Sequence, residues 1–184
     1  NKSPYLLAPE GDGSHEVTGL AFSKTSLYAS YGHRNILAEF DAESGKLKNT
    51  WPVSAPGAIA ALPDGSLVLV LDGRIHTFND GKNMLLCESP LDTPAGIAVD
   101  PTGNVYVANG GALQNVSVFS SDGKYLRSLG KKGGRPRVGR YDKTGILEPG
   151  GIAIDGLGQL WVAETLDAPK RHSVWDTSTG TCSD

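Results

Sequence analysis

The sequence predicts an all-β fold, a β-propeller of four blades with four antiparallel strands in each blade. Two observations lead to this prediction. A segment of about forty residues occurs four times along the 184-residue chain, and each copy divides into four short strands separated by turns. Glycine (24 residues) and proline (11 residues) are abundant without a collagen period, which is typical of many short elements joined by tight turns.

A glycine near the start of each copy anchors the repeat. The anchors lie 38, 39 and 55 residues apart (57 − 19, 96 − 57 and 151 − 96), at Gly19, Gly57, Gly96 and Gly151. The extra residues of the last interval fall in 131–147. We therefore expect an N-terminal segment, residues 1–17, followed by four blades at 18–54, 55–93, 94–147 and 148–184. Within the N-terminal segment, residues 3–8 are a candidate for an outer strand that closes the ring.

The four strands of a copy differ in character. The first is short and rich in small residues, and the second is apolar on both faces, as in 105–108 and 160–163, which indicates burial between two sheets. The third strand alternates and ends in an aromatic residue, at Phe40, Phe78, Phe119 and Trp175. The fourth is the most polar and is expected outermost. We expect the second strands to be the most buried segments, and the rings of Trp161 and Trp175 to fill the packing between blades.

The third copy carries a recognisable motif. It reads PAGIAVD at 94–100 and GNVYVA at 103–108, followed by a strand pair with an Asp-Gly turn. This pattern resembles the NHL repeat. The fourth copy matches well, whereas the first two are degenerate, because Ser23 and Leu62 stand where the family has Asp. The resemblance implies a ring of five or six blades, so four copies imply a small ring or one completed by further blades or another chain.

The resemblance implies several functions, because related propellers serve as protein or RNA platforms, as sensor domains, and as metal-dependent lyases or lactonases. The composition is that of an ordinary soluble domain, and the net charge of −3 does not favour wholesale binding to nucleic acid or an anionic membrane. No apolar run reaches the roughly 18 residues of a membrane span. A similarity to secreted, multi-blade bacterial proteins favours an extracytoplasmic setting.

The residues that would supply chemistry are scattered. No two histidines have a metal-ligand spacing, and neither cysteine has a Cys-x-x-Cys partner; they are His15, His33, His76, His172, Cys87 and Cys182. No nucleophile and base can be paired, and no two carboxylates can be assigned acid and base roles. We therefore predict no catalytic residues, no metal and no cofactor, and favour a non-catalytic binding module over the lyase or lactonase alternative.

The segment inserted before the fourth copy is the most distinctive feature. Residues 131–143 hold six basic residues and one acidic residue, and propeller connectivity places the loop 167–171 on the same face. Clustered basic groups bind phosphate, sulfate or an acidic partner protein. The candidate binding residues are Arg135, Arg137, Arg140, Tyr141, Lys170 and Arg171. One alternative is a loop that is only solvated, and another is a loop whose basic residues pair with neighbouring acidic residues. A third is an RNA-binding platform, for which Tyr141 is the only aromatic residue available among the basic residues.

A second candidate site lies at the ends of the second strands. These ends open toward one rim of a propeller channel and carry polar groups at Tyr31, Asp72, Asn109 and Glu164. We expect these groups either to converge on a ligand or cation, or to cap strand edges and bond to the neighbouring blade.

Overall fold

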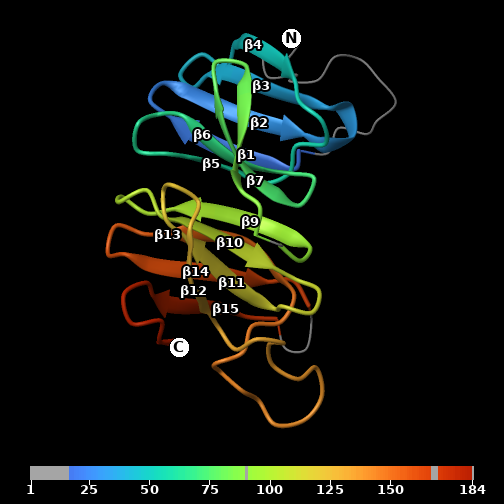
Figure 1. Cartoon of the computed structure of the whole chain (residues 1–184), viewed down its shortest axis with the longest axis vertical. Coiled ribbons are helices and arrows are strands. Elements are labelled where there is room, and N and C mark those ends of the chain that lie inside the picture. The colour runs from blue at the N-terminus through green and yellow to red at the C-terminus, as the bar shows by residue number, and fades with distance from the viewer. Residues whose placement is uncertain (1–16, 90, 167–169, 184) are drawn as a thin grey trace.

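The computed structural model describes residues 17–89, 91–166 and 170–183, and antiparallel strands are the main regular element of this part of the chain. Four small sheets make up the molecule; the two formed by the N-terminal half of the chain lie in the upper half of Figure 1, and the other two lie in the lower half. A single 3₁₀ turn, η1 (Gly32–Arg34), is the only helical element in the described residues. In that same part of the chain, no helix is long and apolar enough to cross a membrane. The predicted β-propeller fold is confirmed.

Each sheet is one blade, and its strands are neighbours in sequence order. Blade one contains β1 (Gly19–Ser23), β2 (Ser26–Tyr31), β3 (Ile36–Asp41) and β4 (Leu47–Pro52). Blade two contains β5 (Ile59–Ala61), β6 (Leu67–Leu71), β7 (Arg74–Asn79) and β8 (Lys82–Cys87). Blade three contains β9 (Pro94–Val99), β10 (Val105–Asn109), β11 (Asn115–Phe119) and β12 (Tyr125–Leu129). Blade four contains β13 (Pro149–Ile154), β14 (Gln159–Glu164) and β15 (His172–Asp176), and an isolated bridge joins Trp175 to Cys182 beyond β15.

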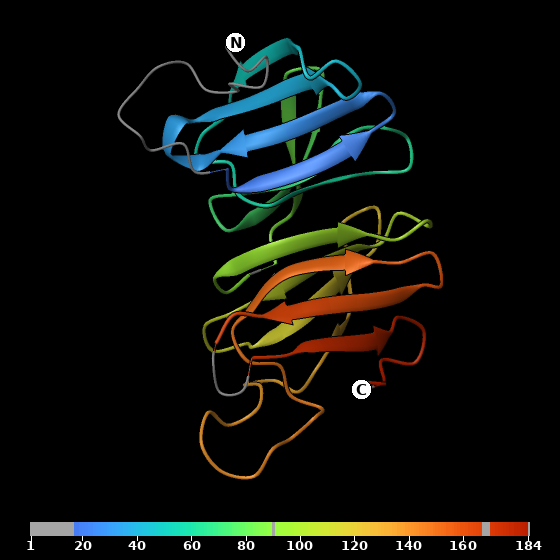
Figure 2. The same ribbon diagram turned by 180° about the vertical axis from the view of Figure 1, so that it is seen from behind.

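The blades are arranged in series. The innermost strands contact one another in the order β1, β5, β9, β13. Blade one and blade four lie at opposite ends of the molecule, as both views show (Figures 1 and 2). The four blades therefore form an arc with two end faces.

Three apolar layers hold the blades together. The layer between blades one and two includes Leu37, Leu69 and Phe78; the next includes Val68, Val105 and Phe119; the last includes Tyr106, Leu160 and Trp175. The aromatic residue that ends the third strand of blades two, three and four thus packs against the preceding blade, whereas Phe40 of blade one lies in a cluster with Ala29, Tyr31 and Ala38 of its own blade. The second strands are largely buried, as the two-sided apolar pattern predicted, and Val107 and Val162 are fully covered.

Strand register defines which positions are equivalent between blades. On the second strands, Tyr28, Val68 and Tyr106 all face the next blade. They pair with Ala21, Ala60 and Ala98 on the first strands, and in blade four Trp161 pairs with Ala153. The residue two places before that alanine is Gly19, Ala58, Gly96 and Gly151. The anchor position of blade two is therefore Ala58 and not Gly57, which is the residue before it. Gly57 lies before β5, and its N–H donates to the carbonyl oxygen of Val70.

The structure corrects one expectation about packing. Trp175 is 2% exposed and fills the layer between blades three and four, as predicted. Trp161 is 45% exposed, so the expectation that its ring packs between blades is wrong. The reason is its side of β14: it points away from blade three, toward the open end of the arc.

Candidate functional site

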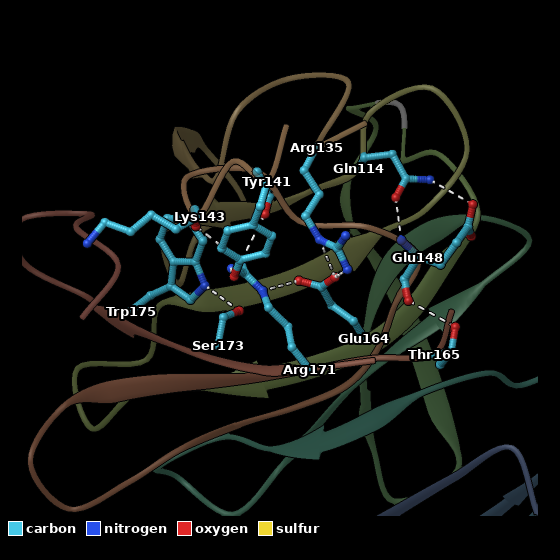
Figure 3. Close-up of polar contacts among 11 residues, drawn as sticks. Gln114, Arg135, Tyr141, Lys143, Glu148, Glu164, Thr165, Arg171, Ser173 and Trp175 are labelled. Carbon is cyan, nitrogen blue, oxygen red and sulfur yellow. Dashed lines mark hydrogen bonds and ion pairs between the residues drawn. The ribbon is translucent and has the colours of Figure 1, made fainter. Parts of the chain in front are cut away.

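A buried carboxylate fixes the long connection 131–147 to blade four (Figure 3). Glu164 ends β14, and its side chain is fully buried. One oxygen accepts hydrogen bonds from Nε and Nη2 of Arg135 at 3.0 and 2.7 Å. The other accepts from Nε of Arg171 at 2.6 Å. Both carboxylate oxygens are therefore occupied by guanidinium groups, one from the connection and one from the loop before β15.

Arg171 extends this contact to the rest of the connection. Its Nη2 donates to the carbonyl oxygens of Lys143 and Gly145 at 3.1 and 2.8 Å, and its Nη1 donates to the hydroxyl of Tyr141. The ring of Tyr141 lies 5.5 Å from the guanidinium carbon of Arg171 and 5.8 Å from that of Arg135. Arginine cations at this distance from an aromatic ring are attracted to it. We call Arg135, Tyr141, Glu164 and Arg171 the clamp.

The clamp depends on charge pairing in a buried place. Isolated buried charges are costly, and only paired and hydrogen-bonded charges are tolerated there. Burial by itself lowers the pKa of Arg171. Its hydrogen bonds to Tyr141 and Glu164 raise the pKa by more than burial lowers it, so the net shift is upward. Arg171 thus keeps its charge throughout the ordinary pH range.

A glycine permits the close approach of the connection at the clamp. Gly134 has a φ of +67°, and a Cβ built on it would lie 2.1 Å from the carbonyl oxygen of Ile146. No residue with a side chain fits there without moving the backbone. The N–H of the next residue, Arg135, donates to that same carbonyl.

A second set of contacts joins blades three and four nearby. Gln114 Nε2 donates to the Glu148 carboxylate at 3.0 Å, and the Glu148 N–H donates to Gln114 Oε1 at 2.5 Å. The Thr165 hydroxyl donates to the Glu148 carbonyl at 2.9 Å. Figure 3 shows these groups beside the clamp. The base of the connection is therefore fixed to both blades.

The predicted binding residues fall into two groups. Arg135 and Arg171 belong to the clamp. Arg137, Arg140 and Lys170 are exposed, and Tyr141 is about half exposed while it contacts the clamp arginines. The predicted meeting of the two loops is confirmed by the bonds between Arg171 and the connection. The sequence indicated a channel-rim position for Glu164 and gave no sign of its pairing with Arg135, which lies 29 residues away.

The other rim candidates are engaged locally. Asn109 is buried, and its amide donates to Val107, Asn115 and Ser117 of its own blade. Asp72 is the first residue of the Asp72-Gly73 hairpin turn, in which both φ angles are positive, at +47° and +70°. Tyr31 is buried, and burial raises the pKa of its phenol.

The histidines lie on separate elements. His33 is in η1, His76 is on β7 and His172 is on β15, whereas His15 lies outside the described residues. Within the described ranges, no three His, Cys, Asp or Glu side chains are grouped so as to hold a metal ion.

Comparison with known proteins agrees with the blade pattern. The NHL repeat-containing protein 3 of Mus musculus is 36% identical over 118 residues, which are 63% of this chain and 30% of the mouse protein. The chain is built of NHL-type β-propeller blades. No family model matches the chain.

Two solved structures share the arrangement of these NHL-type blades. The hydrazine synthase of Kuenenia stuttgartiensis aligns over 97% of this chain and 51% of its own, with 18% identity and a TM-score of 0.71. The virginiamycin B lyase of Staphylococcus aureus aligns over 95% of this chain and 57% of its own, with 17% identity and a TM-score of 0.67. At these identities the likeness shows the fold alone. The chain spans a little over half of each structure.

Proposed function

We propose that these blades form a non-catalytic interaction module, and that the clamped connection docks an acidic partner protein. The observation that carries the proposal is the clamp itself. A loop that only needs solvation does not require a buried carboxylate with two arginines at its base. Long connections without their own secondary structure are usually functional or disordered, and the clamp argues against disorder for this one.

The exposed part of the connection has the composition of a docking surface. Arg137 and Arg140 lie on either side of Val138, which is 88% exposed, and Tyr141 follows them. Arginine and tyrosine are enriched in protein interfaces, where they form the contacts that matter most. Holding the base of the loop in one conformation reduces the ordering entropy that a partner's binding would otherwise cost.

The lyase or lactonase alternative has weaker support. Two structural neighbours are named as lyases, but at 17% and 14% identity they share only the fold with this chain. The described histidines and rim residues do not form a common site. RNA binding is also less favoured, because single-stranded nucleic acid is usually held by several aromatic platforms and the connection has only Tyr141.

The proposal is tested with a defined acidic probe, a fluorescein-labelled polyglutamate peptide, by fluorescence anisotropy. We expect the wild-type chain to bind it, with affinity that falls as salt rises, because exposed charges are screened beyond roughly 10 Å at 0.1 M salt. Reversing two exposed charges with Arg137→Glu and Arg140→Glu is expected to weaken binding at least tenfold.

The matched control reverses two exposed lysines on other blades, Lys82→Glu and Lys124→Glu, which gives the same change in net charge. If the connection is the docking element, this control binds nearly as the wild type does. Absence of wild-type binding at low salt, or equal weakening in both double variants, would overturn the proposal.

A further inference from the structure

A hollow of about 590 Å³ lies between blades two and three, beside their outer strands. Small-molecule sites usually span roughly 300–1,000 Å³, so the hollow is large enough for one. Ser89, just beyond β8, lines it from blade two, and residues of β11 and β12 line it from blade three. Phe119 lines the hollow and also belongs to the apolar layer between the two blades. Both are inner blades of the arc, so the hollow does not depend on what lies against either end.

The hollow corresponds to the place that the clamp occupies one blade later. Asn115 faces Asn109 across strands β10 and β11, and Arg171 faces Glu164 in the same way in blade four. There the connection fills the space and bonds to Glu164 and Arg171 (Figure 3). The link between β12 and β13 has 19 residues, whereas the link between β8 and β9 has 6 (148 − 129 and 93 − 87). The shorter link leaves the equivalent space beside blade three open.

Two buried side chains on the floor of the hollow have unused hydrogen-bond donors. The Asn109 amide donates to Oδ1 of Asn115 at 3.3 Å and to Oγ of Ser117 at 3.0 Å. Among the described residues, no acceptor is bonded to Nδ2 of Asn115 or to the hydroxyl proton of Ser117. Asn115 is 4% exposed and Ser117 is 6% exposed. Because buried donors are usually hydrogen-bonded, this floor fits a ligand with acceptor oxygens.

The walls of the hollow add hydroxyl groups, an aromatic ring and one cation. Tyr125 is 49% exposed, and its hydroxyl is hydrogen-bonded to that of Ser128 at 2.9 Å. Its ring meets the Phe119 ring edge-on, with centroids 5.8 Å apart, and the pair forms an apolar wall. Lys132, at the start of the connection, is exposed, and the described residues that line the hollow include no carboxylate. The lining therefore favours a ligand that carries a negative charge.

We propose that this hollow binds a uronic acid, which is a sugar that carries a carboxylate group. The carboxylate pairs with Lys132, the sugar oxygens accept from Asn115 and Ser117, and the C–H face of the sugar ring packs on Tyr125. A neutral sugar makes no use of Lys132, and a hydrocarbon acid leaves most hydroxyl groups of the lining without partners. The site is separate from the proposed docking element, because it involves neither the clamp nor the exposed arginines of the connection.

The probe that tests the proposal is D-glucuronate, whose dissociation constant is measured by ligand-observed saturation-transfer NMR titration. D-glucose lacks the carboxylate, and cyclohexanecarboxylate lacks the hydroxyl groups. We expect the wild-type chain to bind glucuronate, and to bind each comparison compound about tenfold more weakly, because each lacks one set of polar contacts. Absence of glucuronate binding, or equal affinity for the three compounds, would overturn the proposal.

Two substitutions place the ligand in the hollow. Lys132→Gln removes the cation at an exposed position, and Asn115→Asp replaces a donor with a carboxylate of the same size that repels the ligand. We expect each to weaken glucuronate binding about tenfold or more. Circular dichroism checks that both variants are folded, and the exposed position of Lys132 makes its variant informative even where Asn115→Asp unfolds. The matched control is Lys46→Gln, in a turn of blade one, which is expected to bind as the wild type does.

Wild-type affinity in Lys132→Gln, or equal weakening in Lys46→Gln, would show that glucuronate does not bind in the hollow. The variant with Arg137→Glu and Arg140→Glu is expected to keep full glucuronate binding, so failure of the docking proposal is distinguishable from failure of this one. A galacturonate trimer is then compared with the single sugar. Tighter binding of the trimer would identify a polysaccharide as the source, and equal binding would identify the free acid; weaker binding of both than of D-glucose would contradict the proposed class.

Discussion

The clamp makes a quantitative prediction for Glu164→Gln. This change removes the charge and leaves the shape of the side chain nearly unchanged. Two guanidinium groups, with side chains only 1% and 8% exposed, then face a neutral amide. Removing one partner from a buried ion pair typically costs about 3–5 kcal/mol, because the remaining charge is left uncompensated.

The corresponding change in melting temperature follows from the size of the chain. For domains of about 150–250 residues, 1 kcal/mol shifts the melting temperature by roughly 2–4 °C. We therefore expect Glu164→Gln to melt about 6–20 °C below the wild type in a calorimetric scan. The exposed carboxylate variant Glu43→Gln serves as the control and is expected to melt within about 2 °C of the wild type.

A second readout makes the prediction local. If Glu164 holds the connection, its loss exposes the chain at Arg137 and Arg140 to trypsin, and cleavage there is expected to accelerate before global unfolding. Combining Arg135→Met with Glu164→Gln is expected to cost less than the two single changes added together, because Arg135 is no longer present as an unpaired buried charge; Arg171 loses its partner in Glu164→Gln and in the double variant alike. A melting temperature within 2 °C of the wild type and unchanged tryptic cleavage in Glu164→Gln would refute the reasoning.

Three further predictions concern the blades. Trp175→Ala is expected to destabilise by about 3–5 kcal/mol in urea titration, and Trp161→Ala by less than half as much; equal losses would contradict their placement. Gly96→Val is expected to cost at least about 1–3 kcal/mol through overpacking, and a stable, wild-type-like variant would contradict the backbone contact. Hydrogen bonds from the Ser178 hydroxyl and from nearby backbone N–H groups lower the pKa of Asp176 to about 2. Because the folded pKa lies below the unfolded value of 3.8, this stabilisation is present above pH 3.8 and is lost as the pH falls toward 2. Asp176→Asn should therefore make the free energy of unfolding depend less on pH in that window, and an unchanged pH dependence would contradict the assignment.

The fold was predictable because the repeat carries its own physical signals. Two-sided apolar second strands, Asp-Gly turns and the aromatic residue that ends each third strand all favour the same packing. Phe78, Phe119 and Trp175 do lie between blades as this pattern predicted. The error at Gly57 arose because blade two has Ala58 at the anchor position and a glycine beside it.

The site was predictable only in part. Charge clustering identified the connection and the loop at Lys170 and Arg171, and propeller connectivity brought them together. Neither signal could distinguish the buried Arg135, which is paired with Glu164, from Arg137, which lies two residues later and is exposed. That distinction depends on tertiary contacts between residues far apart in the sequence.

The burial of Trp161 was predicted wrongly for a related reason. Its apolar strand is the same as those inside the arc, and sequence alone does not say whether a blade lies against it.

The most direct test of the proposed docking function is chemical footprinting of arginine. Phenylglyoxal modification of the wild-type chain is mapped by mass spectrometry with and without saturating polyglutamate peptide. The account predicts protection of Arg137 and Arg140 by the peptide, and unchanged modification of Arg74, an exposed arginine of blade two. Equal modification of Arg137 and Arg140 with and without bound peptide, or protection of Arg74 instead, would contradict the claim that the clamped connection is the docking element.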